Sequence, residues 1–314
     1  MSCCCAGKKD CETALSTLMV FGGLSVCSLA ATLLMKKAPK KTETPTTIES
    51  YIPYVKERLK VVAEKLKISE DDILNILPHL KQSEEIKASS GDLSSFIDHT
   101  VLKANAKNSD IAQLCQEAIQ NNFAAVCVNA SNVAFCKKQL TGTKIGIASV
   151  VGFPLGATTT ESKLFETNQA IDLGASEIDI VVNVGKLLDG DYEYVFEELK
   201  QAAELCIQKG AVLKVILECC LLNKELIADA SIICMLAKCH FVKTSTGFST
   251  SGAKLEDCKL MKAVVGNVGL VKAAGGIRDK QAAIQFIQEA KISRIGTSNG
   301  ISIVANSSVT PTGY

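Results

Sequence analysis

Three lysines interrupt segments that otherwise have the apolar character of buried strands: Lys214 in LKVILE, Lys243 in FVKTSTGF and Lys272 in VKAAGG. Burying an ammonium group is unfavourable unless a carboxylate balances it or the chemistry requires a neutral amine. Asp98 in FIDHT and Asp179 in EIDIVVN occupy similar positions. If these side chains share one cavity, burial and neighbouring cations lower the pKa of one lysine, whose neutral amine can then attack an aldehyde or ketone.

Lys243 and Lys272 lie in consecutive strand-like segments, so we expect adjacent strands to bring their amines together. One of the two lysines can then be the neutral nucleophile while the other lowers its pKa, and Asp179 can transfer protons to and from the carbinolamine and enamine. The iminium is itself the electron sink, so this chemistry needs no metal and no other cofactor. The structural alternative is that each lysine is merely ion-paired or reaches water, but the whole set is hard to explain by folding alone.

Strands that alternate with helices must position these residues. Helical patterns at 109–122, 160–175 and 280–290 separate short apolar segments from Asp92 onward. Eight such strands with helical crossovers predict a (β/α)8 TIM barrel, whose active site lies at the C-terminal strand ends; a doubly wound sheet is the alternative. The predicted strands are 96–102, 124–129, 145–153, 177–183, 213–218, 241–246, 269–274 and 294–298.

Glycine-rich turns come after the last predicted strands, with GGIR beginning at Gly275 and GTSNG at Gly296. Glycines allow backbone N–H groups to approach an anion, and in barrels the loops after strands seven and eight commonly hold a phosphate at a helix N-terminus. Thr246 and Gly247, after the sixth strand, would add a third side to such a site. The sequence therefore predicts a phosphate-binding mouth.

Composition narrows the class of protein. With 314 residues, 47% of them hydrophobic, and a net charge of +1, the chain can bury a large core and has no general attraction for nucleic acid. Five of the 14 cysteines fall in the first 27 residues, and the others form no pair of C-x-x-C units. This pattern argues against a zinc site and for reduced thiols in a cytosol-like compartment.

The N-terminal region differs from the rest. Residues 14–35 carry no charge and as a helix would be long enough to span a bilayer core. Lysines at 36, 37, 40 and 41 favour a cytoplasmic location for the remainder of the chain, and the nearby cysteines are candidates for S-acylation. The alternative is a targeting segment that is removed. We expect an anchor or targeting segment with linker at 1–50, a helical segment at 51–91, a barrel at 92–305 and a tail at 306–314.

In the segment 51–91, apolar residues at helical spacing, Val55, Leu59, Val62 and Leu66, predict one helix, and Ser69 predicts the start of a second. The pair suggests no chemistry and would serve as a stalk or pack against the barrel.

The motifs of residues 92–304 resemble the 2-deoxyribose-5-phosphate aldolase family. They are DHTVLK, AAVCVN, VVGFPLGATTTESK, GASEIDIVVNVGKLLDGDY, LKVILE, FVKTSTGF, VKAAGGIRD and RIGTSNG, of which FVKTSTG with VKAAGG is the most specific. The resemblance implies a TIM-barrel class I aldolase of deoxyribonucleotide catabolism. Such an enzyme reversibly cleaves 2-deoxy-D-ribose 5-phosphate to D-glyceraldehyde 3-phosphate and acetaldehyde.

The resemblance also implies residue roles. Lys243 would form the Schiff base, Lys272 would perturb its pKa, and Asp179 would transfer protons. The implied phosphate contacts are Gly275, Gly276 and Ser298, with Thr246 near the sugar phosphate. Asn299 departs from the family pattern, which has a second serine there, and the first 90 residues lie outside the resemblance.

Other residues are assigned supporting or structural roles. Asp98 and Lys214 are expected to support the site, with Lys214 paired to Glu218. His99 should point away from the cavity, because side chains alternate along a strand. Cys127 is expected to be a small buried residue. Some members of the family that the chain resembles use a C-terminal tyrosine near the active site, so Tyr314 is a candidate there, with a solvated tail as the alternative.

Two other functions remain open: a different Schiff-base aldolase or transaldolase, and a sugar-phosphate binding protein without turnover. The small residues around Lys243 favour a two-carbon donor over a ketose. Partners other than the sugar phosphate would be a membrane, through residues 14–35, and a second copy in a homodimer.

Overall fold

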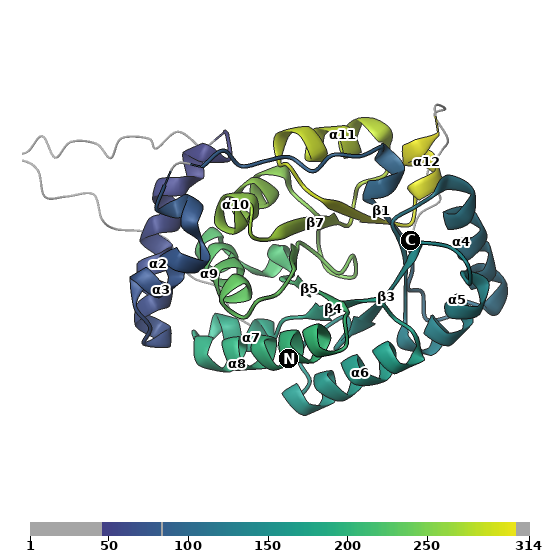
Figure 1. Ribbon diagram of the computed structural model, residues 1–314, viewed down its shortest axis with the longest axis horizontal. Coiled ribbons are helices and arrows are strands. Elements are labelled where there is room, and N and C mark those ends of the chain that lie inside the picture. The colour runs from purple at the N-terminus through teal and green to yellow at the C-terminus, as the bar shows by residue number, and fades with distance from the viewer. Residues whose placement is uncertain (1–45, 83, 306–314) are drawn as a thin grey trace, which may run out of the picture. The chain divides into compact units, whose positions relative to one another are not determined.

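The computed structural model describes residues 46–82 and 84–305, in which eight parallel strands close a barrel in sequence order (Figure 1). All eight predicted strands are present. The doubly wound alternative is wrong, because β1 pairs with β8 and leaves no open edge. The strands are β1 Ile97–Val101, β2 Ala125–Val128, β3 Gly146–Val151, β4 Glu177–Val181, β5 Val212–Ile216, β6 Phe241–Lys243, β7 Leu270–Ala274 and β8 Arg294–Thr297.

Helices surround the barrel and connect its strands (Figure 1). The predicted helical stretches are confirmed, and their ends have ordinary causes: Asn223 caps the start of α9, and Gly174, with φ 115°, ends α6. The helices are α4 Asn108–Asn121, α5 Val133–Gln139, α6 Thr160–Leu173, α7 Val184–Leu188, α8 Tyr192–Gln208, α9 Lys224–Leu236, α10 Leu255–Val265, α11 Lys280–Glu289 and α12 Gly300–Val304.

The predicted helical pair is also present, as α2 (Ile52–Leu66) and α3 (Glu70–Ile76). Ser69 caps α3 by accepting a hydrogen bond from the Asp72 amide. The apolar face of α2 packs against α8, α9 and α10. This second layer explains why α9 is buried around almost its whole circumference. The proposed domain bounds remain predictions.

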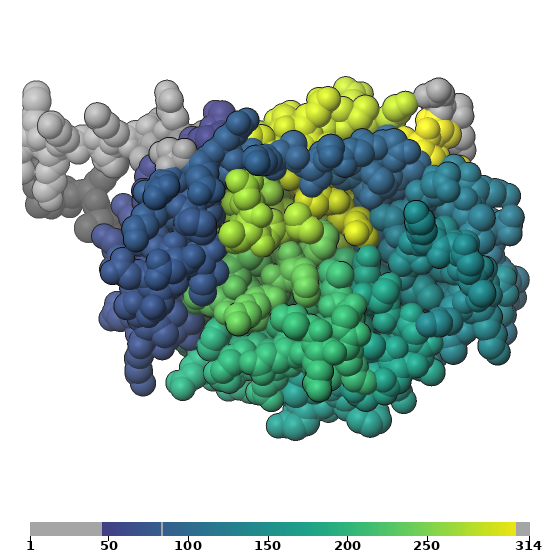
Figure 2. Space-filling model, in the orientation of Figure 1, coloured from purple at the N-terminus to yellow at the C-terminus, as the bar shows by residue number. Residues whose placement is uncertain are grey.

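The segment between α3 and β1 runs beside α10 and α11 and is visible as a blue strip in Figure 2. Asn267, just before β7, accepts from the Lys87 amide at 2.9 Å and donates to Glu85 O at 3.0 Å. Lys291, before β8, donates to Ile86 O at 2.6 Å. The segment is therefore fixed to the N-terminal ends of two strands, opposite the mouth.

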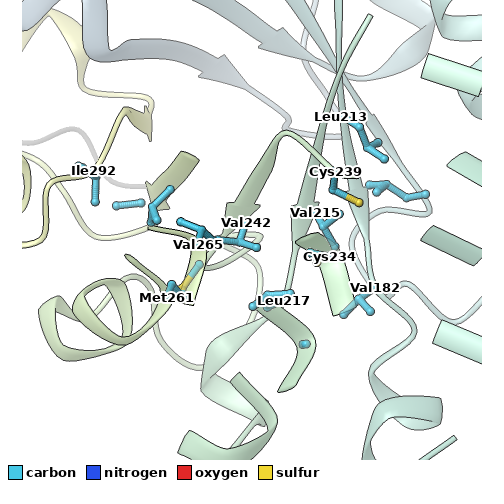
Figure 3. Close-up of a cluster of buried hydrophobic side chains, with 14 of the residues drawn as sticks. Val182, Leu213, Val215, Leu217, Cys234, Cys239, Val242, Met261, Val265 and Ile292 are labelled. Atoms are coloured by element: carbon cyan, nitrogen blue, oxygen red, sulfur yellow. The ribbon is translucent and has the colours of Figure 1, made fainter. Parts of the chain in front are cut away.

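The core between the barrel and its helices is apolar (Figure 3). Leu213, Val215 and Leu217, along and just after β5, pack with the residues of the surrounding helices. Because side chains alternate along a strand, this outward row leaves Lys214 facing the barrel interior. The strand pattern that builds the core thus also directs a lysine into the site.

Within the described residues, no helix is long and apolar enough to cross a membrane. The predicted span at 14–35 and the tail with Tyr314 lie outside those residues.

Candidate active site

One carboxylate at the centre of the barrel contacts three lysines. Asp179 Oδ2 accepts from Lys243 Nζ at 2.7 Å and from Lys272 Nζ at 2.8 Å, and Oδ1 accepts from Lys214 Nζ at 2.7 Å. All four side chains are buried. The structure thus brings together the residues that the sequence placed on separate strands.

Strand register explains this convergence. Lys243 and Lys272 are direct neighbours across β6 and β7, and Asp179 and Lys214 are neighbours across β4 and β5. β6 ends at Lys243, three residues earlier than expected, because Thr244 to Thr246 leave the strand for the loop. Lys243 is thus the last residue of its strand, and its side chain is 4% exposed, whereas those of Lys214 and Lys272 are fully buried.

A second layer of charges lies beside the first. Asp98 accepts from Lys272 Nζ at 2.5 Å and from Arg294 at 2.6 Å, and Glu177 contacts Lys214 at 2.5 Å and Arg294 at 3.2 Å. Sequence reasoning missed Arg294 and Glu177. Alternation could have found Glu177, which stands two residues before Asp179 on the same strand and so faces the same way.

These contacts shift the pKa values of the three lysines in different directions. Burial lowers the pKa of Lys243, opposed by Asp179 and assisted by the Lys272 cation. For Lys272, burial acts in the same direction, but Asp179 and Asp98 outweigh it and raise its pKa. For Lys214, Asp179 and Glu177 likewise outweigh burial and raise the pKa. Lys243 alone of the three therefore tends toward a neutral amine.

The aspartate stays ionised. Burial would raise the pKa of Asp179, but Lys214, Lys243 and Lys272 together hold it well below the usual range. A carboxylate in this state can accept a proton from a reacting group and return it, with Lys272 as a neighbouring proton donor.

The predicted Lys214–Glu218 ion pair is wrong. Lys214 contacts Asp179 and Glu177 instead. Glu218 has a left-handed backbone, with φ 54° and ψ 59°, which turns its side chain toward the loop after β6. There its carboxylate accepts from the Thr246 hydroxyl at 2.5 Å and from the Thr246 amide at 3.3 Å.

The glycine-rich loops come into contact at the mouth. A Cβ on Gly252 would lie 2.2 Å from Gly275 O, so the loops after β6 and β7 can meet only through glycines. A Cβ on Gly275 would lie 3.7 Å from the Cα of Gly247, which places these two residues close together. Gly276 comes directly after Gly275 and is exposed.

The loop after β8 supplies the third side. A Cβ on Gly296 would lie 3.1 Å from Lys272 Cε, so this glycine makes room for the Lys272 side chain. Ser298 and Asn299 line a cavity of about 470 Å³ together with Phe248 and the loop after β1, including Lys103 and Lys107. A cavity of this size is in the range of small-molecule sites.

The residues assigned structural roles lie as expected. His99 Nε2 is 2.6 Å from Glu117 Oε2 on α4 and therefore faces the helices rather than the barrel interior. Cys127 is buried with Leu102, Ala148 and Val150, and burial raises the pKa of its thiol. Within the described residues, no cluster of His, Cys, Asp and Glu is suited to hold a metal ion.

A closed parallel barrel with buried lysines and aspartates converging in its interior is the arrangement typical of barrel enzymes, whose active sites lie at the C-terminal strand ends. Residues 94–307 match the family model described as DeoC/LacD family aldolase, and the chain belongs to this family.

Among its relatives, Deoxyribose-phosphate aldolase 1 of Mesoplasma florum is 52% identical over 215 residues, which is 68% of this chain and 95% of that protein. The deoxyribose-phosphate aldolase of Caldicellulosiruptor saccharolyticus is 48% identical over 68% of this chain and 97% of that one. A solved structure described as the unique tetrameric structure of deoxyribose phosphate aldolase from Aeropyrum pernix is 30% identical, with a TM-score of 0.63 over 75% of this chain and 97% of that chain.

Proposed function

We propose that the chain is a class I aldolase that reversibly cleaves 2-deoxy-D-ribose 5-phosphate to D-glyceraldehyde 3-phosphate and acetaldehyde. The observation that carries the proposal is the position of Lys243. It has a lowered pKa, it lies 2.7 Å from Asp179, and it neighbours the Lys272 cation at the barrel mouth. The names of the relatives support the substrate.

In the proposed reaction, the neutral Lys243 amine adds to C1 of the open-chain sugar, and loss of water from the carbinolamine gives an iminium. Removal of the C3 hydroxyl proton then breaks the C2–C3 bond, and the electron pair moves into the iminium to form an enamine. D-Glyceraldehyde 3-phosphate leaves as the aldehyde. Protonation of the enamine at C2 and addition of water release acetaldehyde and regenerate the amine.

Asp179 and Lys272 are the proposed proton-transfer pair. Their side chains are 2.8 Å apart. Asp179 lies 2.7 Å from the Lys243 nitrogen that becomes the carbinolamine and iminium nitrogen, and Lys272 neighbours Lys243 across β6 and β7. Asp179 accepts protons as the carboxylate, and Lys272 donates them as the ammonium. Asp98 supports the pair by holding the Lys272 amine, and Lys214 supports it by holding the Asp179 carboxylate.

The phosphate is proposed to bind between the loops after β6, β7 and β8. Backbone N–H groups at glycines make short approaches to an anion that other residues would block. The proposed contacts are Gly247, Gly275, Gly276 and Ser298, with Thr246 and Gly296 shaping the loops that carry them. Asn299 replaces a serine side chain without removing a backbone donor.

Reductive trapping tests the proposal. We expect incubation with 2-deoxyribose 5-phosphate and borohydride to leave a stable adduct on the parent, measured by intact mass. Lys243→Ala should show none, whereas Lys200→Ala, which removes an exposed lysine, should keep the adduct. A folded parent without an adduct would favour a binding protein. Separate incubations with acetaldehyde, acetone and dihydroxyacetone distinguish the two-carbon donor from those of other Schiff-base aldolases.

We also propose that residues 14–35 tether the catalytic domain to a membrane from the cytoplasmic side, and that the chain forms a homodimer. The apolar run and the lysines after it support the first proposal. The second is supported by self-association in a relative, the deoxyribose phosphate aldolase of Aeropyrum pernix, whose solved structure is described as tetrameric. Full-length protein that stays in the supernatant after membranes are removed would contradict tethering, and a monomer in sedimentation would contradict the dimer.

A further inference from the structure

We propose that Glu218 is a positioning residue that holds the loop after β6 in the conformation that receives the substrate phosphate. This inference rests on the proposed function. It assigns Glu218 neither to the proton-transfer pair nor to direct substrate binding.

The first observation is that three consecutive residues just after β5 hold the end of β6 and the start of the loop that follows it. The Leu217 amide donates to Lys243 O at 2.9 Å, and the Cys219 amide donates to Thr244 O at 2.9 Å. Between them, the Glu218 carboxylate accepts both the amide and the hydroxyl of Thr246. The contacts of Leu217 and Cys219 are made by backbone and tolerate many side chains, whereas the contact at Glu218 requires an acceptor with two oxygens.

The second observation is the backbone of Glu218, which is left-handed, at φ 54°. This conformation is unfavourable for a residue with a Cβ and is usual only for glycine and asparagine. The residue is 4% exposed, and the ion pairs found among the described residues do not include its carboxylate. The Glu218 carboxylate is therefore buried on a strained backbone, and its main partner is Thr246. Since both features are unfavourable, we infer that the contact with the loop after β6 is what they serve.

The third observation concerns what Thr246 does with its hydroxyl. It donates to Glu218 and accepts from the Phe248 amide at 3.0 Å, closing a turn around Gly247. A hydroxyl has one proton, so Thr246 cannot also donate to a phosphate in this arrangement. Among the hydrogen bonds of the described residues, none uses the Gly247 amide, which lies beside Gly275. Glu218 thus holds Thr246, and the turn that Thr246 closes leaves the Gly247 amide available to an anion.

Because Glu218 carries a negative charge, a direct electrostatic effect and a positioning role predict opposite changes in substrate binding when that charge is removed. A carboxylate close to a phosphate repels it, so a direct electrostatic effect predicts that removing the charge strengthens substrate binding. A positioning role predicts the opposite, because the Thr246 amide and hydroxyl donate to different oxygens of Glu218, and glutamine places an N–H₂ donor where one of those acceptors lies.

The experiment measures kcat and KM of Glu218→Gln and Thr246→Val with 2-deoxyribose 5-phosphate and with unphosphorylated 2-deoxyribose. We expect each variant to raise the KM for the phosphorylated substrate about tenfold, as for loss of one hydrogen bond. Kinetics with 2-deoxyribose should change less than about twofold, because Lys243 is held by separate contacts. The double variant should be no worse than the poorer single variant.

A lower or unchanged KM for the phosphorylated substrate in Glu218→Gln would overturn the inference, as would equal losses on both sugars. Glu218→Gly relieves the backbone strain but removes the carboxylate, so it should show the same defect as Glu218→Gln. If the Glu218 variants do not fold, Thr246→Val still tests the contact between Glu218 and the loop, because it removes the hydroxyl that donates to Glu218.

Borohydride trapping with acetaldehyde, which has no phosphate, separates this inference from the proposed function. An adduct on Glu218→Gln equal to that of the parent shows that the Schiff-base site is intact and that only the phosphate loop is altered. A parent without an adduct would remove the proposed function whatever the Glu218 variants do, and the inference with it.

Discussion

Two buried ion networks in this protein use similar groups and reach different states. Inside the barrel, Lys214, Lys243, Lys272 and Arg294 share the carboxylates of Asp98, Asp179 and Glu177. Outside it, between α2, α8 and α9, Arg58 donates twice to Asp229, at 2.8 and 2.5 Å, and the Tyr192 hydroxyl also donates to Asp229. The outer network pairs one cation with one anion, whereas the inner one has more cations than anions.

The difference explains why one network is reactive and the other structural. In the outer network, the hydrogen bond to Asp229 raises the pKa of Arg58 and more than offsets burial, so its charge is fixed. In the inner network, Lys272 contacts two aspartates, while Lys243 shares a single carboxylate oxygen with it. Burial therefore prevails at Lys243. An incomplete set of counter-charges yields a neutral nucleophile, and a complete set yields a stable contact.

The largest effect is expected from removing a cation of the inner network. Lys272→Met should lower kcat/KM about 10²- to 10³-fold, since a proton donor is lost. It should also raise the pKa of Lys243, because the Lys272 cation lowers that pKa and its loss leaves Asp179 more available to Lys243. The acid limb of the pH profile should therefore move to higher pH. An unshifted limb would contradict the comparison, and Lys272→Arg, which keeps the charge, should shift it less.

Breaking the outer network should affect stability rather than activity. Arg58→Met leaves Asp229, which has no exposed side-chain surface, without its cation, and we expect unfolding free energy to fall by about 3 kcal/mol in urea titrations. The kcat and pH profile of the remaining folded enzyme should match the parent. Arg58→Lys keeps the charge but loses the paired hydrogen bonds, so its unfolding free energy should lie between those of the parent and Arg58→Met. A change in the pH profile would show that the two networks are coupled.

The smallest effect is expected at an exposed pair with similar geometry. Lys186 Nζ lies 2.9 Å from Asp191, and both side chains are about two-fifths exposed, at 41% and 40%. Lys186→Ala should leave the urea midpoint and kcat unchanged, because water screens the pair and the Asp191 cap of α8 is kept. If Lys186→Ala lowered the unfolding free energy nearly as much as Arg58→Met, burial would not be the reason why the Arg58–Asp229 pair is the more stabilising.

Much of the site was predictable because it obeys strand alternation. Lys243, Lys272 and Asp179 interrupt apolar strands, and in a closed parallel barrel such positions must face one interior. Arg294 was missed because its strand is short and its position near the strand start does not suggest a role at the mouth. Glu218 was misassigned because spacing along the chain suggested a partner four residues away, while a left-handed backbone turned it to another loop.

The sequence by itself determined the eight strands and the order of the helices, since local periodicity and turn residues encode them. It also determined that Lys243, Lys272 and Asp179 enter the barrel, because they interrupt apolar strands. Only the tertiary structure decided which lysine has the lowered pKa, because that depends on how many carboxylates lie within a few ångströms of each amine. It also decided that α2 covers α9, through a contact between residues 171 positions apart, which no local pattern records.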